Sequence, residues 1–164
     1  MPKALQCSGV PGWPKATGFS DIVLTLTRAG DDCIAIKGNS TNIISKNITC
    51  YRTHGMPIGS VGQDPTHPDF VRDIVYEDVH LINSTNGAWI KAWQGRSSSV
   101  TTNGDSGGGG GGFINNVTYR NFRIENVGQP ISVTQCVYGH DPSICDTSKV
   151  RLTVLTSTVL LPES

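Results

Sequence analysis

The sequence has no excess of either charge and no stretch that is long and apolar enough to span a bilayer. Thirteen basic residues balance thirteen acidic ones in a chain of 164, and 16% of the residues are charged. Without a net field the chain has no general attraction for nucleic acid or for an anionic membrane, so an acidic ligand would need a local cluster of cations. We therefore expect neither nucleic acid nor a membrane as a partner.

The sequence also lacks the usual spacing of a metal site. Its cysteines form no CxxC motif and have no neighbouring histidine at the spacing of zinc ligands, so we expect neither a metal nor a cofactor. The five cysteines are Cys7, Cys33, Cys50, Cys136 and Cys145, and four Asn-x-Ser/Thr sequons begin at Asn39, Asn47, Asn83 and Asn116. Together they favour a secreted glycoprotein with disulfides. The first seven residues have no apolar signal-peptide core, so the chain is either intracellular or lacks its true beginning.

The residues that are present favour an all-β fold in a single domain. The chain is 37% hydrophobic, which fits a globular protein, and its apolar runs are short and rich in Ile and Val. Nineteen glycines and many Asn, Ser and Thr residues indicate frequent turns. A length of 164 residues corresponds to one domain.

Internal repetition is the strongest structural signal. Three nine-residue segments align without gaps at 42–50, 73–81 and 116–124, with apolar residues in the second, seventh and ninth places. Because side chains alternate along a strand, the seventh and ninth residues should point inward and the eighth outward. The expected inward pairs are Ile48/Cys50, Val79/Leu81 and Phe122/Ile124, and the expected outward residues are Thr49, His80 and Arg123.

A second apolar strand lies between the repeats. It is marked by Ile36, Ile58, Ile90 and Ile131, at spacings of 22, 32 and 41 residues. A coil of about 22 residues with growing insertions predicts a solenoid of parallel strands whose equivalent positions stack about 4.8 Å apart.

The insertions lie at 60–69 and 94–112. The second contains six consecutive glycines at 107–112, where we expect a flexible surface loop, with a flap over a binding groove as the alternative. The residues before Gly30 and from Val150 onward lose the repeat register. We therefore expect one β-helix domain over 1–164 that is incomplete at both ends, with its motif-bearing part at 30–148.

Four polar residues stand next to equivalent positions of this solenoid. Asp32 and His54 each lie four residues before a marker isoleucine, and Lys91 directly follows another. The pair Asp31 and Asp32 should therefore meet the histidine and the lysine from three neighbouring coils. Two carboxylates at close range can divide acid and base roles between them. Taken singly, the residues have plainer interpretations, namely a Gly-Asp-Asp turn, a loop histidine and a solvated lysine.

The same register places Cys33 and Cys50 on adjacent strands. A disulfide between them would contribute about 3 kcal/mol and would fix the strand that follows the acids. Cys136 and Cys145, nine residues apart, are expected to form a second, local disulfide. Cys7 is left over.

These residues belong to motifs that resemble those of the polygalacturonase family, the pectin-degrading glycoside hydrolases of family 28. The motifs are GDDCIAIK at 30–37, HG at 54–55 followed by IGSVG at 58–62, and WIKAWQG at 89–95. The chain is similar to a truncated exopolygalacturonase-like member. The resemblance implies a right-handed, single-stranded parallel β-helix of the pectin-lyase-like kind. It also implies a secreted monomer that hydrolyses α-1,4-linked galacturonic acid in polygalacturonate with inversion.

The resemblance also implies a role for each site residue. Asp31 would be the general acid that protonates the glycosidic oxygen, and Asp32 would help to activate the attacking water. His54 would support the acid through hydrogen bonds, and Lys91 would bind the substrate carboxylate. Inversion requires a water between acid and base, so the working carboxyls should stand about 6.5–9.5 Å apart.

The sequence departs from the family at two places. The third catalytic acid of the family's Asn-Thr-Asp motif is missing, and Thr17 stands where it would fall. The family's Arg-Ile-Lys begins here with Trp89, which we expect to stack on the sugar ring, while Trp93 either does the same or packs in the core.

Three alternatives remain open for the function. The first departure favours a β-helix that binds acidic polysaccharide without cleaving it. Another alternative is a hydrolase of rhamnogalacturonan or xylogalacturonan. The insertion at 94–112 could block one end of the groove, which favours action at chain ends over action within the chain.

Overall fold

The structure of the chain, a computed structural model, describes residues 5–7, 17–23, 27–28, 30–96, 107–137 and 142–160. Nearly all regular structure in this part is β-strand. The strands are β1 (Leu5–Cys7), β2 (Thr17–Val23), β3 (Thr27–Arg28), β4 (Ile34–Ile36), β5 (Ser40–Tyr51), β6 (Met56–Val61), β7 (Asp69–Ile82), β8 (Asn86–Ala92), β9 (Gly111–Glu125), β10 (Gln129–Thr134) and β11 (Lys149–Leu160), and the described helix is α1 (Pro142–Cys145). No helix in these ranges has the length and apolar character needed to cross a membrane.

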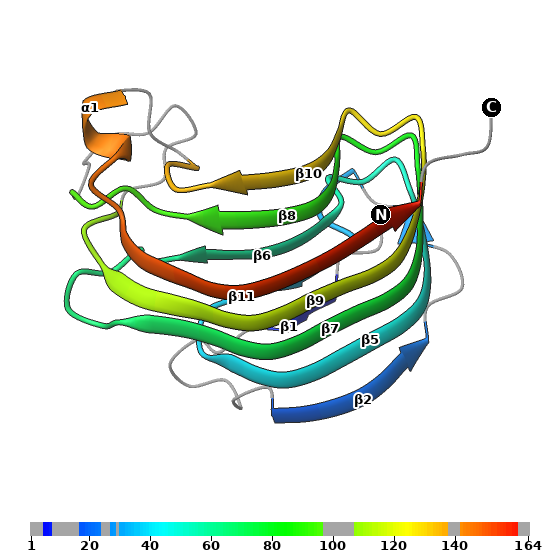
Figure 1. Ribbon diagram of the computed structural model, residues 1–164, viewed down its shortest axis with the longest axis horizontal. Helices are drawn as coiled ribbons and strands as arrows, with labels where there is room; N and C mark the ends of the chain where they lie inside the picture. The colour runs from blue at the N-terminus through cyan, green and yellow to red at the C-terminus, as the bar shows by residue number, and fades with distance from the viewer. Residues whose placement is uncertain are drawn as a thin grey trace.

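The strands form two sheets. Sheet A has the order β1-β4-β6-β8-β10, and sheet B has the order β11-β9-β7-β5-β2, with β3 beside β5. All of these pairings are parallel. From β4 to β11 the chain alternates between the two layers, so each coil adds one strand to each sheet (Figure 1). The protein is therefore a parallel β-helix, which confirms the predicted fold class.

Sheet B confirms the repeat alignment. The predicted inward residues stack in two rows, Ile48–Val79–Phe122 and Cys50–Leu81–Ile124. None of the six is more than 4% exposed. On the opposite face, Arg123 is exposed and Thr49 and His80 are partly buried. The period-two pattern thus identified both the register and the buried face of this sheet.

Asparagine and aspartate bend the sheet-B strands. The first and sixth places of each repeat hold one of these residues, and all six have φ between 51° and 58°. Asn and Asp tolerate this left-handed conformation better than other non-glycine residues. Their side chains also bond between coils, with Asn116 Nδ2 donating to Asp73 Oδ1 at 2.8 Å and Asn121 Nδ2 to Asp78 Oδ1 at 2.9 Å. The bends curve sheet B around the core (Figure 1).

Two buried tyrosines connect the layers. Tyr76 and Tyr119 occupy the same rung of neighbouring sheet-B strands, and their ring centroids are 5.3 Å apart. The Tyr76 hydroxyl donates to the Ile34 carbonyl at 3.2 Å, and the Tyr119 hydroxyl donates to the Met56 carbonyl at 3.4 Å. Burial raises the pKa of Tyr119 well above its usual range. Both hydroxyls therefore act as donors that tie sheet B to the strands of sheet A.

One sheet-A strand lies two residues from its predicted register. Val133 pairs with Ile90, and Ile131 pairs with Ala88. The choice of Ile131 as the fourth marker was therefore wrong. A slip of two residues keeps the same face of the strand, so Ile131 and Val133 lie on the same face. On this last strand of the sheet, Ile131 and Val133 are 51% and 54% exposed.

The expectation that both ends lose the repeat register was also wrong for the described residues. Strand β11 pairs with β9 from Lys149 opposite Gly111 to Leu160 opposite Arg123. Strands β1 and β2 pair in parallel with β4 and β5. Both β2 and β11 contain a register shift, and a sequence alignment without gaps cannot detect strands that are shifted in this way.

The glycines at 107–110 do not form the predicted free loop. Residues 108–110 are buried, and the Gly110 N–H donates to the Gly62 carbonyl at 3.1 Å. A Cβ on Gly110 would lie only 2.5 Å from the Asp64 carbonyl oxygen and 2.7 Å from that of Gly62. The absence of a side chain is thus what lets these backbones approach. Residues 97–106 of the predicted loop or flap lie outside the described ranges.

We expect Gly110→Ala to lower the free energy of unfolding by about 1–3 kcal/mol, because the new methyl group must displace backbone atoms. Gly111→Ala is the matched control, since a Cβ at Gly111 meets nothing within 4 Å. Urea unfolding followed by circular dichroism measures both variants. Equal stabilities of the two variants would contradict the close packing at Gly110.

Candidate functional site

The paired acids stand where the chain enters sheet A. Asp31 and Asp32 come just before β4, and His54 comes just before β6, the next strand of the sheet. The His54 N–H donates to the Asp31 carbonyl at 3.0 Å, and the Cys33 N–H donates to the Gly55 carbonyl at 2.9 Å. These backbone bonds hold the two turns together and bring the acids and the histidine to one place, as the repeat register predicted.

Lys91 completes the cluster from β8. Its Nζ lies 3.2 Å from Asp32 Oδ2, and the Lys91 and Asp32 side chains are only 6% and 10% exposed. Nζ also lies 4.2 Å from the ring centroid of Trp89, within the range of a cation–π interaction. The repeat register predicted that Lys91 meets the acid pair, and the family resemblance assigned its charge to the substrate carboxylate. The sequence did not predict that Lys91 and Asp32 form a buried ion pair. Lys91 therefore neutralises a buried carboxylate inside the protein.

Asp31 is the accessible member of the acid pair. Its side chain is 76% exposed, and its Oδ1 lies 3.5 Å from Nδ1 of His54. The same Oδ1 accepts the backbone N–H of Asp32 at 2.7 Å. The two neighbouring carboxylates thus have different surroundings, one open to solvent beside an imidazole and the other buried against an ammonium.

The two acids and the histidine are also the residue types that hold metal ions. One ligand atom from each of Asp31, Asp32 and His54 lies within 4.8 Å of the others. The Lys91 ammonium already sits against Asp32, so a cation here would compete with a charge that the protein supplies itself. The arrangement is therefore better suited to proton transfer than to metal binding.

Thr53 supports the histidine turn, a role that sequence reasoning missed. Its buried hydroxyl accepts the Gly55 N–H at 3.1 Å and lies 3.1 Å from the hydroxyl of Ser84 on the following turn. These bonds fix the backbone on both sides of His54. The available signal was a small hydroxyl residue directly before the His-Gly pair, matched by Ser84 after the second repeat.

Two sequence expectations are resolved by position. Trp93 was predicted either to stack on the sugar or to pack in the core. It is 2% exposed, so it packs in the core. Thr17 begins β2 and pairs with Thr41 in sheet B, whereas β1 is the strand that precedes β4 in sheet A. Thr17 therefore does not occupy the place of a third acid, one coil before the acid pair.

Both predicted disulfides are present. Cys33 is bonded to Cys50 and Cys136 to Cys145, with S–S distances of 2.08 Å and 2.12 Å. The expectation that the first bridge joins adjacent strands was wrong, because Cys33 precedes β4 of sheet A and Cys50 lies in β5 of sheet B. The bridge crosses the core between the layers and anchors the residue that follows Asp32. The side chain of Cys7 lies outside the described part.

The predicted glycosylation sites lie at bends or turns of the backbone. Asn39, Asn47, Asn83 and Asn116 all have positive φ. Asn39 is partly buried, and its Nδ2 donates to Asp69 Oδ1 at 3.3 Å, whereas the other three are exposed. Their glycosylation stays a prediction.

The fold and the cluster together define a parallel β-helix in which Asp31, Asp32, His54 and Lys91 meet at neighbouring strands of sheet A. The chain matches the family described as glycosyl hydrolases family 28 over residues 19–160, and it belongs to that family.

Three fungal relatives illustrate the similarity. The chain is 39% identical over 134 residues to a protein described as a probable exopolygalacturonase B of Aspergillus terreus, covering 80% of this chain and 28% of the relative. It is 40% identical over 130 residues to an exopolygalacturonase of Cochliobolus carbonum, covering 79% and 29%. It is 40% identical over 150 residues to a probable exopolygalacturonase X of Neosartorya fischeri, covering 91% and 34%. The chain thus spans about a third or less of the length of these relatives.

We expect Lys91→Met to lower the free energy of unfolding by about 3–5 kcal/mol, because it leaves the buried Asp32 carboxylate without its ammonium. Lys46→Met is the matched control. Lys46 forms an ion pair of 3.0 Å with Glu77, but its side chain is 38% exposed, and we expect a loss of about 0–1 kcal/mol. Urea unfolding of both variants checks this difference, and similar losses would show that Lys91 and Asp32 are not a buried pair.

Proposed function

We propose that this protein hydrolyses the α-1,4-galacturonosyl linkages of pectin and polygalacturonate. The observation that carries the proposal is the meeting of the acid pair, His54 and Lys91 at neighbouring strands of sheet A. Carboxylates can move the protons that glycoside hydrolysis requires, and a cationic side chain suits an acidic sugar. The names of the relatives, which are exopolygalacturonases, agree with this substrate.

In this proposal Asp31 is the general acid. Its exposed carboxyl can approach a glycosidic oxygen from solvent, and His54 Nδ1, 3.5 Å away, supports it by hydrogen bonding. Asp32 orients the attacking water through Oδ1, because Oδ2 faces Lys91. Asp31 gives its proton to the leaving oxygen, the water adds its hydroxyl to the anomeric carbon, and the second proton of the water passes to the Asp32 carboxylate.

Lys91 and Trp89 are the proposed substrate contacts. Lys91 Nζ uses one side for Asp32, and an ammonium has three donors, so a galacturonate carboxylate can approach the remaining ones. Trp89 is partly buried beneath this ammonium, and the uncovered part of its ring offers an apolar surface for the sugar.

The spacing of the acids supports a second candidate, binding of acidic polysaccharide without cleavage. An inverting enzyme needs carboxyls about 6.5–9.5 Å apart to admit the water, whereas oxygens of Asp31 and Asp32 approach within 4.8 Å. So close an approach leaves little room for a water between the two acids, which favours binding over cleavage. Within the described residues of sheet A, no acid stands one coil before the pair.

The remaining parts of the proposal concern the mode of action, the type of pectin, secretion and the oligomeric state. Action at chain ends follows the names of the relatives. Lys91, which would face a carboxylate at the cleavage subsite, favours galacturonan over rhamnogalacturonan or xylogalacturonan. We also propose a secreted monomer, for which the disulfides and the exposed sequons are the supporting features. Chromatographic sizing of the products distinguishes chain-end action, which releases monomer, from internal action, which releases a ladder of oligomers.

We expect Asp31→Asn to reduce the release of reducing sugar from polygalacturonate by about 100-fold or more, because the amide cannot donate the catalytic proton. Asp78→Asn is the matched control, since the equivalent rungs at Asn47 and Asn121 already hold asparagine at the same positive φ.

The parent chain must be measured in the same assay. A parent that is inert but retained on a pectate column would favour the binding candidate. An active parent whose rate survives Asp31→Asn would show that Asp31 is not the general acid.

A further inference from the structure

A groove of about 510 Å³ lies at sheet B, where β9 and β11 begin. It is lined by Gly112, Phe113, Asn115, Lys149, Arg151 and Thr153. The parallel register sets these residues side by side, with Arg151 opposite Phe113 and Thr153 opposite Asn115. The groove is therefore a product of two neighbouring coils and uses none of the acid-site residues.

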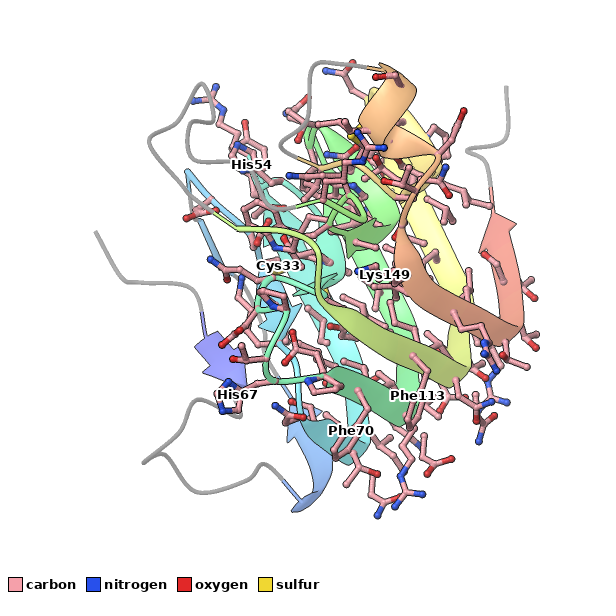
Figure 2. The ribbon with its side chains drawn as sticks, turned by 90° about the vertical axis from the view of Figure 1, so that its left-hand side faces the viewer. Cys33, His54, His67, Phe70, Phe113 and Lys149 are labelled. Carbon is pink, nitrogen blue, oxygen red and sulfur yellow. A yellow bond between two sulfur atoms is a disulfide. The ribbon has the colours of Figure 1, made fainter. Side chains whose placement is uncertain are left out.

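An aromatic stack forms one side of this groove. Phe113 is 42% exposed, and its ring lies 5.7 Å from the ring of Phe70, nearly parallel at 18°. The two residues occupy the same rung of β7 and β9, and Figure 2 shows them next to each other. An exposed ring on a rigid strand offers a flat apolar surface, which suits the C–H face of a sugar.

The cations of the groove differ from the others on this sheet. Lys46, Arg120 and Arg123 each pair with a glutamate within 3.0 Å. Lys149 Nζ instead donates to the neutral Gly109 carbonyl at 3.0 Å, and the exposed Arg151 has no acidic partner among the described residues. The described residues that line the groove include no acid. Its positive charge is thus held in place without being neutralised, which favours an anionic ligand.

The groove is separate from the acid site. Asp31 and His54 lie just before the first residues of β4 and β6 in sheet A. Phe70 and Phe113 lie near the starts of β7 and β9 in sheet B, which come after the last residues of β6 and β8 along the chain. The two sites are therefore separated by about the length of a sheet-A strand. Strand β8, for example, has 7 residues and is roughly 20 Å long at the usual rise per residue. Figure 2 shows His54 well removed from Phe70 and Phe113.

We propose that this groove is a second saccharide site, which binds a segment of oligogalacturonate outside the acid site. A uronate ring stacks on Phe113, and its carboxylate pairs with Arg151 and Lys149. The choice of galacturonate rests on the proposed function, whereas the need for an anionic sugar rests on the groove itself. Such a site would hold a pectin chain against the protein while another part of the chain occupies the acid site.

Binding of trigalacturonate to the ¹⁵N-labelled chain, followed by NMR, tests the proposal. Asp31→Asn is used as the background so that the ligand survives. We expect saturable shifts at the amides of Phe113, Lys149 and Arg151. Arg151→Gln, an exposed change, should weaken binding at these amides about tenfold, as should Phe113→Ala. Arg123→Gln, which removes a cation paired with Glu125, should leave that binding unchanged.

Four results would overturn the second site. Shifts confined to the acid-site residues, or an affinity unaffected by Arg151→Gln, would exclude binding in the groove. Equal binding of neutral maltotriose would show that the charge is irrelevant, and equal binding of inorganic phosphate would show a general anion site. Hydrolysis is scored separately on the parent chain, so loss of the proposed function and loss of the second site give different outcomes.

Discussion

Parallel pairing between successive coils is the constraint on which this structure depends. It requires each strand to lie directly beside its counterpart one coil away, so a side chain acquires neighbours that are 22 to 43 residues distant in sequence. In sheet A this places Lys91 of β8 against Asp32 beside β4, and His54 beside Asp31. In sheet B the same constraint sets Arg151 beside Phe113. Both the acid site and the groove are therefore consequences of one register.

Much of this register could be predicted because it follows from the alternation of apolar and polar residues within single strands. The second, seventh and ninth places of the repeat are buried on every coil, so three gapless segments sufficed to align β5, β7 and β9. The acid pair and His54 lie at fixed distances from residues of sheet A, and their convergence followed from that alignment. The pairing of Cys33 with Cys50 followed from the register as well, although the layers that this disulfide connects did not, whereas the pairing of Cys136 with Cys145 followed from their closeness in sequence.

The features that could not be predicted depend on contacts without a local pattern. The sequence predicted a loop at the glycines 108–110. No pattern near these glycines indicates that the carbonyl groups of Gly62 and Asp64 pack closely against Gly110. The register brought Lys91 near the acids, but the burial of its ion pair with Asp32 depends on long-range contacts in the same way. The Asn and Asp residues at the bends occur in the first and sixth places of each repeat. The alignment rested on the apolar second, seventh and ninth places, so it did not predict the bends. Gapless alignment also missed β2 and β11, whose register shifts partway.

The contact between Asp32 and Lys91 depends most directly on the stacking of the coils, since only stacked coils can bring these residues together in a buried pair. A double-mutant cycle of Asp32→Asn and Lys91→Met, with each free energy of unfolding taken from urea titration, measures their interaction. The structure predicts a coupling energy of about 1–3 kcal/mol. Additive effects, with a coupling below about 0.3 kcal/mol, would contradict the stacking of these coils and the site built on it.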